Sequence, residues 1–425
     1  MRKVFGIRSL TSALCALGLA FAAGPAPASE PIVIGVPTAL TSLEGREGFK
    51  ALTMAVEEIN AKGGVKVGKE KRPFKVESID TRDSDPGVPV SDAILGHEKL
   101  ILEKKAKFIV FGAFRSEAAV AAMDVVAKYK IPMILGTAMA PAVQKKVTED
   151  YEKYKYTFRV CLNAPYLVQY LAGTMEHIKT EFGFTKVMVM HQDVAWARGT
   201  ADALVKSYFN AKGWEVVGQE AYPTGAGDFS AALMKAKAKG AQVIVPIFDM
   251  PQSGTLVKQW NTMRVPALVA GFVSPLSGPG AWKTFGAEID GDLNVIFESG
   301  AIPIAKIPES VTFWNAYKKR WGDAIEAGHA VAPAYDMVYV LADAIERAGT
   351  LDGDAVVAAL EKTDRKGAIG RIRFGKDHQV VYGFNPAETA MAAVTEWRAG
   401  KREVVFPESI AETKIRLPAD LKPAK

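Results

Sequence analysis

Short apolar runs alternate with helical patterns along most of this 425-residue chain, and this alternation limits the fold more than any other feature. In the first third of the chain, each apolar run is followed by a segment whose apolar residues recur at spacings of three and four. Strict alternation of this kind is typical of a parallel sheet covered by helices on both faces. The expected strands are 32–36, 74–80, 108–111 and 133–135, and the expected helices are 45–61, 88–104 and 116–129.

The same pattern then starts again. The second set of expected helices is 164–182, 198–212, 229–239 and 252–261, and the second set of expected strands is 186–191, 215–220, 243–248 and 267–270. No linker rich in Gly or Ser separates the two halves. We therefore expect an α/β fold of two doubly wound lobes in direct contact, with a ligand cleft at the carboxyl ends of their strands.

Residues 1–28 have the pattern of a secretory signal peptide. Arg2, Lys3 and Arg8 form a basic start, residues 10–23 are almost wholly apolar, and small residues suited to cleavage follow. The apolar run is shorter than the ~20 residues that span a bilayer, which disfavours the alternative of a membrane anchor. We therefore predict a cleaved signal peptide and export to the periplasm of a bacterium.

Charge and cysteine content narrow the possible partners. The chain has 53 Lys and Arg against 47 Asp and Glu, a net charge of +6 with no basic block, so nothing indicates nucleic-acid binding. Removal of the signal peptide takes away three basic residues and leaves 50 − 47 = +3. It also leaves Cys161 as the single cysteine, which excludes an intrachain disulfide.

Motifs of the common enzyme classes are missing from the sequence. There is no phosphate-binding GxxxxGK[ST] pattern, no GxGxxG after the first expected strand, no GxSxG nucleophile elbow and no HExxH, and the five His residues are scattered. We therefore expect a binding protein without cofactor or metal rather than an enzyme. An exported α/β hydrolase is the enzyme alternative.

One strand–helix turn has the chemistry to hold a carboxylate. The strand at 108–111 ends in Gly112, and Arg115 and Ser116 follow where the next helix is expected to start. Free amide groups and the positive end of the helix dipole attract an anion there, while Ser116 adds a hydroxyl and Arg115 a charge. The alternative is an N-cap Ser116 on a solvated loop, with Arg115 facing water.

An ordered series of segments resembles the type I periplasmic binding proteins of the branched-chain amino acid (Leu/Ile/Val) group. The segments are 32–36, 55–65, Asp80 with 84–86, 227–230, 334–349 and 370–374. The resemblance implies two Rossmann-like lobes joined by three crossovers, near Leu162, Gly300 and Phe374. It implies lobe 1 at 29–162 plus 301–370 and lobe 2 at 163–300 plus 371–425.

The family resemblance also implies a function. Such proteins are extracytoplasmic substrate-binding proteins of ABC importers. They close on a small ligand between the lobes and deliver it to the permease subunits in the inner membrane. For this chain we expect a monomer that binds a small carboxylate-bearing ligand. A ligand-sensing receptor domain of the same fold is the alternative.

Site residues carry over where positions match. Ser116 falls on the family's carboxylate-binding serine. Thr137 and Ala138 fall on the next strand–helix turn, where Met139 stands in place of the expected Thr. Trp196 falls on an aromatic residue that would cover the ligand, and the alternative is that it packs between the lobes.

Three positions depart from the family pattern and leave two ligand classes open. Either Asp249 or Phe248 falls where amino-acid binders often keep a Tyr. Phe272 falls near the expected acidic partner of an ammonium group, and Glu44 falls in a loop where an aromatic residue is common. Either Asp249 or Glu44 binds the ammonium of an amino acid, or the ligand is an aromatic or aliphatic acid without an ammonium. In the second case the acid lies among aromatic side chains with an arginine counter-ion, and the candidates are Phe114, Trp196, Phe248 and Phe272 with Arg115 or Arg198.

Overall fold

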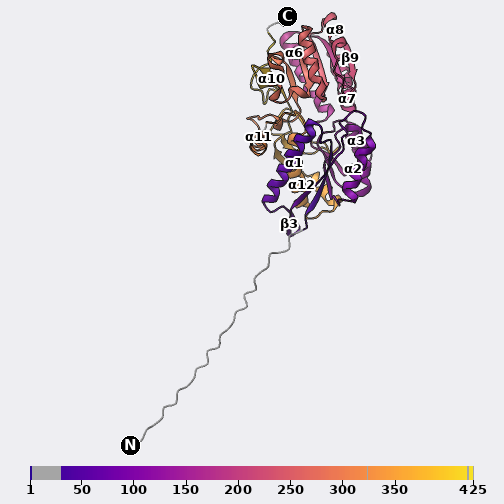
Figure 1. Cartoon of the computed structure of the whole chain (residues 1–425), viewed down its shortest axis with the longest axis vertical. Helices are drawn as coiled ribbons and strands as arrows, with labels where there is room; N and C mark the ends of the chain where they lie inside the picture. The colour runs from indigo at the N-terminus through magenta and orange to yellow at the C-terminus, as the bar shows by residue number, and fades with distance from the viewer. Residues whose placement is uncertain (2–29, 323, 419–420, 425) are drawn as a thin grey trace.

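The computed structural model describes residues 30–322, 324–418 and 421–424, together with Met1. The predicted signal peptide, residues 1–28, lies outside the described residues except for Met1. The described chain forms two α/β bodies, one above the other, with α1, α2 and α12 in the lower body and α6, α8 and β9 in the upper (Figure 1).

The lower body is built on five parallel strands in the order β4-β1-β5-β6-β7. Their bounds are β1 Ile32–Thr38, β4 Phe74–Asp80, β5 Phe108–Phe111, β6 Met133–Leu135 and β7 Thr157–Arg159. Every residue of β5 is buried, as the continuous apolar sequence of a strand covered on both faces requires. A short hairpin, β2 Val65–Val67 with β3 Glu70–Arg72, was not predicted.

Helices from two distant parts of the chain cover this sheet. The first group follows the strands in sequence and comprises α1 Leu43–Ala61, α2 Val90–Leu102, α3 Ser116–Tyr129, α4 Ala142–Glu149 and α5 Tyr151–Tyr154. The second group returns late and comprises α11 Pro308–Trp321, α12 Val331–Ala348 and α13 Gly353–Leu360. In Figure 1, α12 lies beside α1, and the Tyr335 hydroxyl donates to Glu58 Oε2 at 2.6 Å between these two helices.

The upper body is built on seven strands in the order β16-β15-β12-β11-β10-β8-β9. Five of them are parallel, whereas β15 and β16 are antiparallel additions at one edge. The strands are β8 Lys186–Gln192, β9 Glu215–Tyr222, β10 Val243–Phe248, β11 Leu268–Val273, β12 Leu293–Ile296, β15 Ala393–Arg398 and β16 Lys401–Phe406. The helices are α6 Ala164–Phe182, α7 Ala195–Leu204, α8 Ser230–Ala238, α9 Gly254–Thr262 and α10 Gly280–Phe285, with a π-helical turn at Val205–Phe209 and 3-10 turns at Pro251–Ser253, Ser274–Leu276 and Gly286–Ile289.

The chain passes between the two sheets three times. It leaves the lower sheet after β7, returns through the 3-10 turn Ser299–Ala301 after β12, and enters the upper sheet again between the small β13–β14 hairpin (Arg365–Gly367 and Gly370–Ile372) and β15. The buried Glu298 carboxylate accepts the amides of Leu162 and Ala330, both at 3.0 Å, and so ties the first passage to the second. The predicted two-lobe α/β fold is confirmed, and the lobe bounds given above stay a prediction.

Two predicted helices differ from the structure at their ends. The helix expected over 198–212 begins at Ala195 and changes to a π-helical turn after Leu204, while the helix expected over 252–261 begins as a 3-10 turn. Pro251 stands first in that turn, where its missing amide removes no hydrogen bond. Both changes leave the sheet order unaffected.

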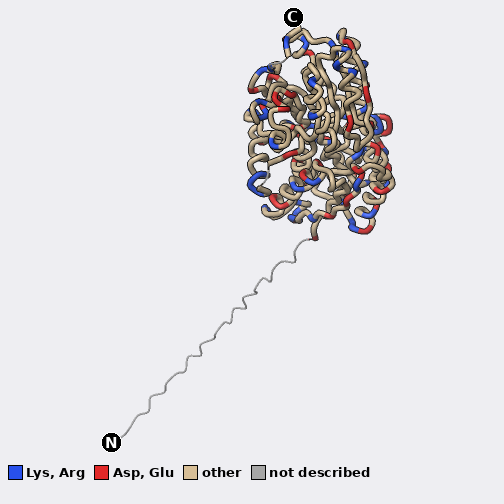
Figure 2. The backbone as a smooth tube through the Cα atoms, turned by 45° about the horizontal axis from the view of Figure 1, so that its top comes forward, with Lys and Arg blue, Asp and Glu red and all other residues tan. Residues whose placement is uncertain are grey.

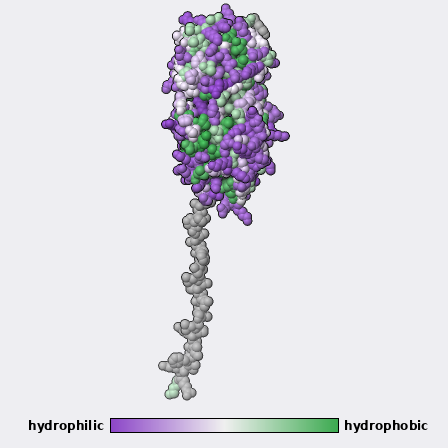
Figure 3. Space-filling view, turned by 90° about the vertical axis from the view of Figure 1, so that its right-hand side faces the viewer, coloured by the Kyte–Doolittle hydropathy of each residue, from purple (hydrophilic) through white to green (hydrophobic). Residues whose placement is uncertain are grey.

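Acidic and basic residues are interspersed over both bodies, without a block of one sign (Figure 2). The face shown in Figure 3 is mostly hydrophilic, with smaller hydrophobic areas between. Among the described residues, no helix combines the length and the apolar character needed to cross a membrane.

Candidate functional site

The candidate site lies where the strand order reverses in each sheet, because the loops at such a point diverge and leave a crevice. In the lower sheet this point lies between β1 and β5, and in the upper sheet between β8 and β10. The loop after β1 leads to Glu44, and the loop after β5 to Arg115. Trp196 and Asp249 follow β8 and β10 on the facing side.

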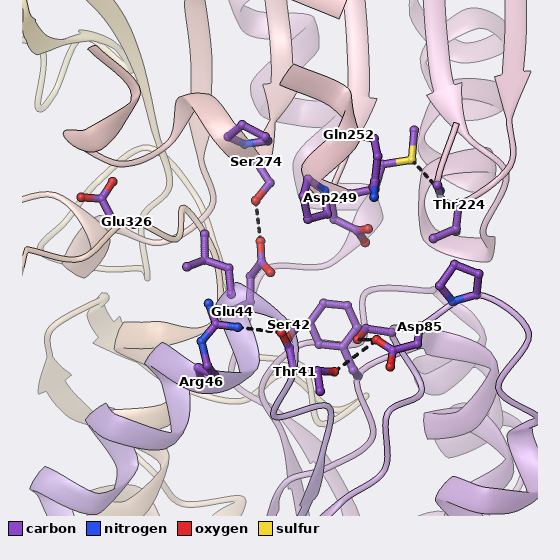
Figure 4. A pocket seen from close by; sticks show the side chains of 18 of the residues that line it. Thr41, Ser42, Glu44, Arg46, Asp85, Thr224, Asp249, Gln252, Ser274 and Glu326 are labelled. Carbon is purple, nitrogen blue, oxygen red and sulfur yellow. Dashed lines mark hydrogen bonds between the residues drawn. The ribbon is translucent and has the colours of Figure 1, made fainter. Parts of the chain in front are cut away.

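A cavity of about 640 Å³ occupies this crevice and is lined by residues of both bodies (Figure 4). We call it the outer chamber. Its wall combines apolar side chains such as Leu43, Met250 and Phe285 with hydroxyl and amide groups such as those of Thr224 and Gln252. Its charged residues are Glu44, Arg46, Asp85, Arg115, Asp249 and Glu326.

A second, much smaller cavity of about 20 Å³ lies against the outer chamber and shares Glu44, Phe114 and Asp249 with it. We call it the inner aromatic pocket. Its other lining residues are Thr137, Met139, Trp196, Phe272, Phe297 and His329. The ring centroids of Phe272 and Phe297 are 4.1 Å apart, and that of Trp196 lies 6.2 Å from Phe272. The aromatic side chains pack on one another and fill most of the volume they enclose.

An ion pair joins the two bodies at the boundary between the cavities. Arg115 Nη1 donates to Asp249 Oδ2 at 2.6 Å, and the two side chains are only 12% and 11% exposed. Trp196 Nε1 donates to the same Oδ2 at 2.9 Å. The Arg115 amide donates to Asp83 Oδ2 at 2.8 Å, which fixes the backbone of the turn. The Arg115 charge is therefore already neutralised by protein.

Glu44 makes a second link between the bodies. It lies in the first turn of α1, whose N-cap Ser42 accepts the Gly45 amide at 2.8 Å. Its Oε1 accepts the Ser274 hydroxyl at 2.6 Å, and the residue is 3% exposed (Figure 4). Burial raises the pKa of Glu44, while the N-terminal end of the helix dipole favours its charged form.

Ser116 has a different environment from the one expected. It begins α3, is 1% exposed, and its hydroxyl oxygen accepts the amides of Met139 and Ala140, each at 3.1 Å. It does not line the outer chamber or the inner aromatic pocket. Ala138 lines neither cavity, and its carbonyl accepts Arg159 Nη1 at 2.9 Å.

The structure brings together most of the other predicted residues. Glu44, Phe114, Thr137, Trp196, Asp249 and Phe272 all line the inner aromatic pocket, and Arg115 lines the outer chamber. Phe248 faces the other side of the upper sheet, where it packs on Phe229 at 5.4 Å between ring centroids. Arg198 pairs with Asp193 at 2.6 Å and lines neither cavity.

Sequence reasoning missed Phe297 and His329. His329 Nε2 lies 2.8 Å from the Thr137 carbonyl oxygen, and Nδ1 lies 3.1 Å from Glu298 Oε1. Burial lowers the pKa of His329, but the Glu298 carboxylate, the Thr137 carbonyl and the charge of Glu44 together raise it above its usual value. No local motif marks either residue. Phe297 directly follows β12, and the end of a strand in this sheet is the one signal that could have found it.

Arg159 supports the turn that carries Thr137. It is fully buried and donates to the carbonyls of Ala138 and Ala140 and to Gln379 Oε1, at 2.9, 3.0 and 2.6 Å. Burial lowers the pKa of Arg159 to about 10. The third passage of the chain, which carries Gln379, is thus connected to the wall of the inner aromatic pocket.

Within the described part of the chain, no three His, Cys, Asp or Glu residues are grouped so that they could hold a metal ion. The residues that line the two cavities offer hydrogen-bonding groups, charges and aromatic surface.

Comparison with known proteins identifies the family. A model of the family described as periplasmic binding protein matches residues 31–400. The chain belongs to the periplasmic binding protein family. This periplasmic binding protein is 26% identical over 417 residues to the Leu/Ile/Val-binding protein homolog 7 of Brucella melitensis, with 94% of this chain and 97% of the relative covered.

Solved structures share the two-lobe fold of this periplasmic binding protein. A putative branched-chain amino acid ABC transporter protein from Silicibacter pomeroyi matches with a TM-score of 0.77 and 19% identity, over 92% of this chain and 100% of that one. A branched-chain amino acid transporter substrate binding protein from Streptococcus pneumoniae, solved with isoleucine, matches at 0.72 and 23%, over 89% and 100%. A solute binding protein from R. palustris, solved with benzoate, matches at 0.71 and 17%, over 90% and 99%. At these identities the likeness shows the fold alone.

Proposed function

We propose that this protein is the extracytoplasmic substrate-binding protein of an ABC importer. It binds a small carboxylate-bearing ligand between its lobes and delivers it to permease subunits in the inner membrane. The observation that carries the proposal is the outer chamber of about 640 Å³. Residues of both bodies line it, at the place where the strand order reverses in each sheet. The family supports this function, and it also supports a location outside the cytoplasm.

The mechanism needs only binding and closure. The contacts of Arg115 with Asp249 and of Glu44 with Ser274 exist only when the two bodies approach each other. A ligand that contacts both walls of the chamber adds further contacts to this closed form and shifts the population toward it. The permease then receives a closed, loaded protein.

The carboxylate of the ligand is supported by the neighbours and by one residue of the chamber. The neighbours from S. pneumoniae and R. palustris were solved with isoleucine and with benzoate, and both molecules carry a carboxylate. In this chain, Arg46 lines the chamber, is exposed, and donates to the Thr41 carbonyl at 2.6 Å. Among the described residues its guanidinium has no carboxylate partner within 4.0 Å, so it is available to a carboxylate ligand.

A thermal-shift screen followed by calorimetry tests the proposal. The purified chain without residues 1–28 is mixed with amino acids, aromatic acids and short aliphatic acids. We expect at least one compound to raise the melting temperature by an amount that grows with the logarithm of its concentration, with no product formed. A panel in which nothing binds, or a bound compound that is turned over, would contradict the proposal.

A further inference from the structure

The outer chamber is lined by more acidic than basic residues, and this excess bears on the charge of a ligand that could enter it. Of its six charged residues, four are acidic and two are basic. Arg115 forms an ion pair with Asp249, so these two charges cancel each other. The residues left are Glu44, Asp85, Glu326 and Arg46, three carboxylates against one guanidinium.

None of these three carboxylates has a cationic partner in the described chain. Asp85 accepts the Thr41 hydroxyl at 3.1 Å, and Glu326 accepts the Gly280 amide at 2.9 Å. Among the described residues, no Lys, Arg or His nitrogen lies within 4.0 Å of the carboxylate oxygens of Glu44, Asp85 or Glu326. Hydrogen bonds from neutral groups hold these carboxylates in place without cancelling their charge.

We propose that the ligand of this protein carries a net positive charge and places a protonated amine or guanidinium against Glu44. The inference rests on the proposed function, because it assigns the class of ligand that occupies the same chamber. A basic amino acid has one carboxylate, which can pair with Arg46, and two cationic groups, which can pair with the acidic residues of the chamber.

Glu44 is the residue best placed to select the cation. It is 97% buried, since 3% of it is exposed, and among the described residues the one side chain that donates to its carboxylate is Ser274. A carboxylate removed from water needs a partner of opposite charge, and a ligand cation supplies one.

The same observations disfavour a simple acid such as benzoate. An anion in the chamber would face three unpaired carboxylates. The two arginines considered as its counter-ions, Arg115 and Arg198, are already paired with Asp249 and Asp193. Arg46 can pair with one carboxylate of a ligand. A second anionic group would find no unpaired basic residue among the described residues that line the chamber.

Arginine and citrulline form a matched pair for the test, because they have nearly the same shape and differ in the charge of the terminal group. Dissociation constants are measured by calorimetry at constant pH and low salt, together with agmatine, leucine and benzoate. We expect arginine to bind at least about tenfold more tightly than citrulline, the effect of a hydrogen bond between charged groups. In Glu44→Gln the difference should fall below about threefold, while Glu103→Gln, an exposed position on the lower body, keeps it.

Each outcome separates the two proposals. The cation assignment is overturned if arginine and citrulline bind with equal affinity. It is also overturned if leucine or benzoate binds while arginine and agmatine do not. Both results leave the importer function in place. Binding of agmatine without arginine keeps the cation and removes the carboxylate. No binding of any compound overturns both proposals. The comparison in the unmodified protein needs no variant, so a misfolded Glu44→Gln does not weaken the test.

Discussion

The outer chamber and the inner aromatic pocket share three residues but differ in almost every other respect. The chamber has about 640 Å³ and a wall that mixes apolar and charged side chains, whereas the pocket has about 20 Å³ and is closed by aromatic rings in tilted and edge-on contact. The expected aromatic site is therefore occupied by the protein itself. Residues expected to bind a ligand thus hold the two lobes together, while the larger cavity lies next to them.

The largest effect is expected from emptying the inner aromatic pocket. Phe272 is 1% exposed and packs on Phe297, so Phe272→Ala should lower the free energy of unfolding by about 3–5 kcal/mol. Gln252→Ala, at an exposed position of the outer chamber, should change it by less than about 0.5 kcal/mol. Denaturant unfolding measures both, and equal effects would erase the distinction between the two regions.

The next effect concerns the ion pair at the boundary. Asp249→Ala leaves the Arg115 guanidinium without a carboxylate partner, although the Arg115 side chain is only 12% exposed. This change should lower the free energy of unfolding by about 3 kcal/mol. The double variant Arg115→Met, Asp249→Leu should recover most of that loss, because no lone charge remains. A double variant as unstable as Asp249→Ala in denaturant unfolding would show that the pair is not the cause.

A pH effect comes from Glu47, which is 8% exposed one turn after Glu44 on α1. Burial raises the pKa of Glu47 to about 7, although its carboxylate accepts the amides of Glu326 and Ala327. Because the folded state holds the proton more tightly than the unfolded state, the stabilisation present below pH 4.5 is lost as the pH rises through about 7.

Between pH 5 and pH 8 this loss should amount to about 2–3 kcal/mol. Glu47→Gln should remove this contribution to the pH dependence of the free energy of unfolding. Other buried groups, such as Glu44 and His329, still contribute to that dependence. The measurement is the free energy of unfolding of both proteins at the two pH values. Identical slopes would mean that Glu47 is charged in the folded protein throughout this range.

The smallest effect is expected at Ser116. Ser116→Ala removes the acceptor of two buried amides and should destabilise the protein by about 1–2 kcal/mol. Ser207→Ala, at an exposed position, serves as the control. If the variant keeps its stability but loses affinity for a ligand found by the screen, Ser116 binds that ligand directly, as the family resemblance implies.

Much of the fold and part of the site could be predicted. The alternation of strands and helices in 32–270 predicted two parallel sheets, because side-chain periodicity reflects burial within each element. Strands β15 and β16 escaped that analysis because they complete the upper sheet from a distant segment. Glu44, Phe114, Trp196, Asp249 and Phe272 line the inner aromatic pocket because they lie at or near the ends of strands, and their contact with a ligand stays a prediction.

The sequence by itself determined the periodic elements, the two-lobe class and the edge at which the site must lie. Only the tertiary structure decided which charges are neutralised. Arg115 and Asp249 are 134 positions apart and meet at 2.6 Å, while Glu44 meets Ser274 across 230 positions and forms no ion pair with a described residue. The periodicity of apolar residues depends on neighbours along the chain, so the sequence determines it. Charge pairing depends on which loops of two separate sheets lie face to face, so only the tertiary structure determines it.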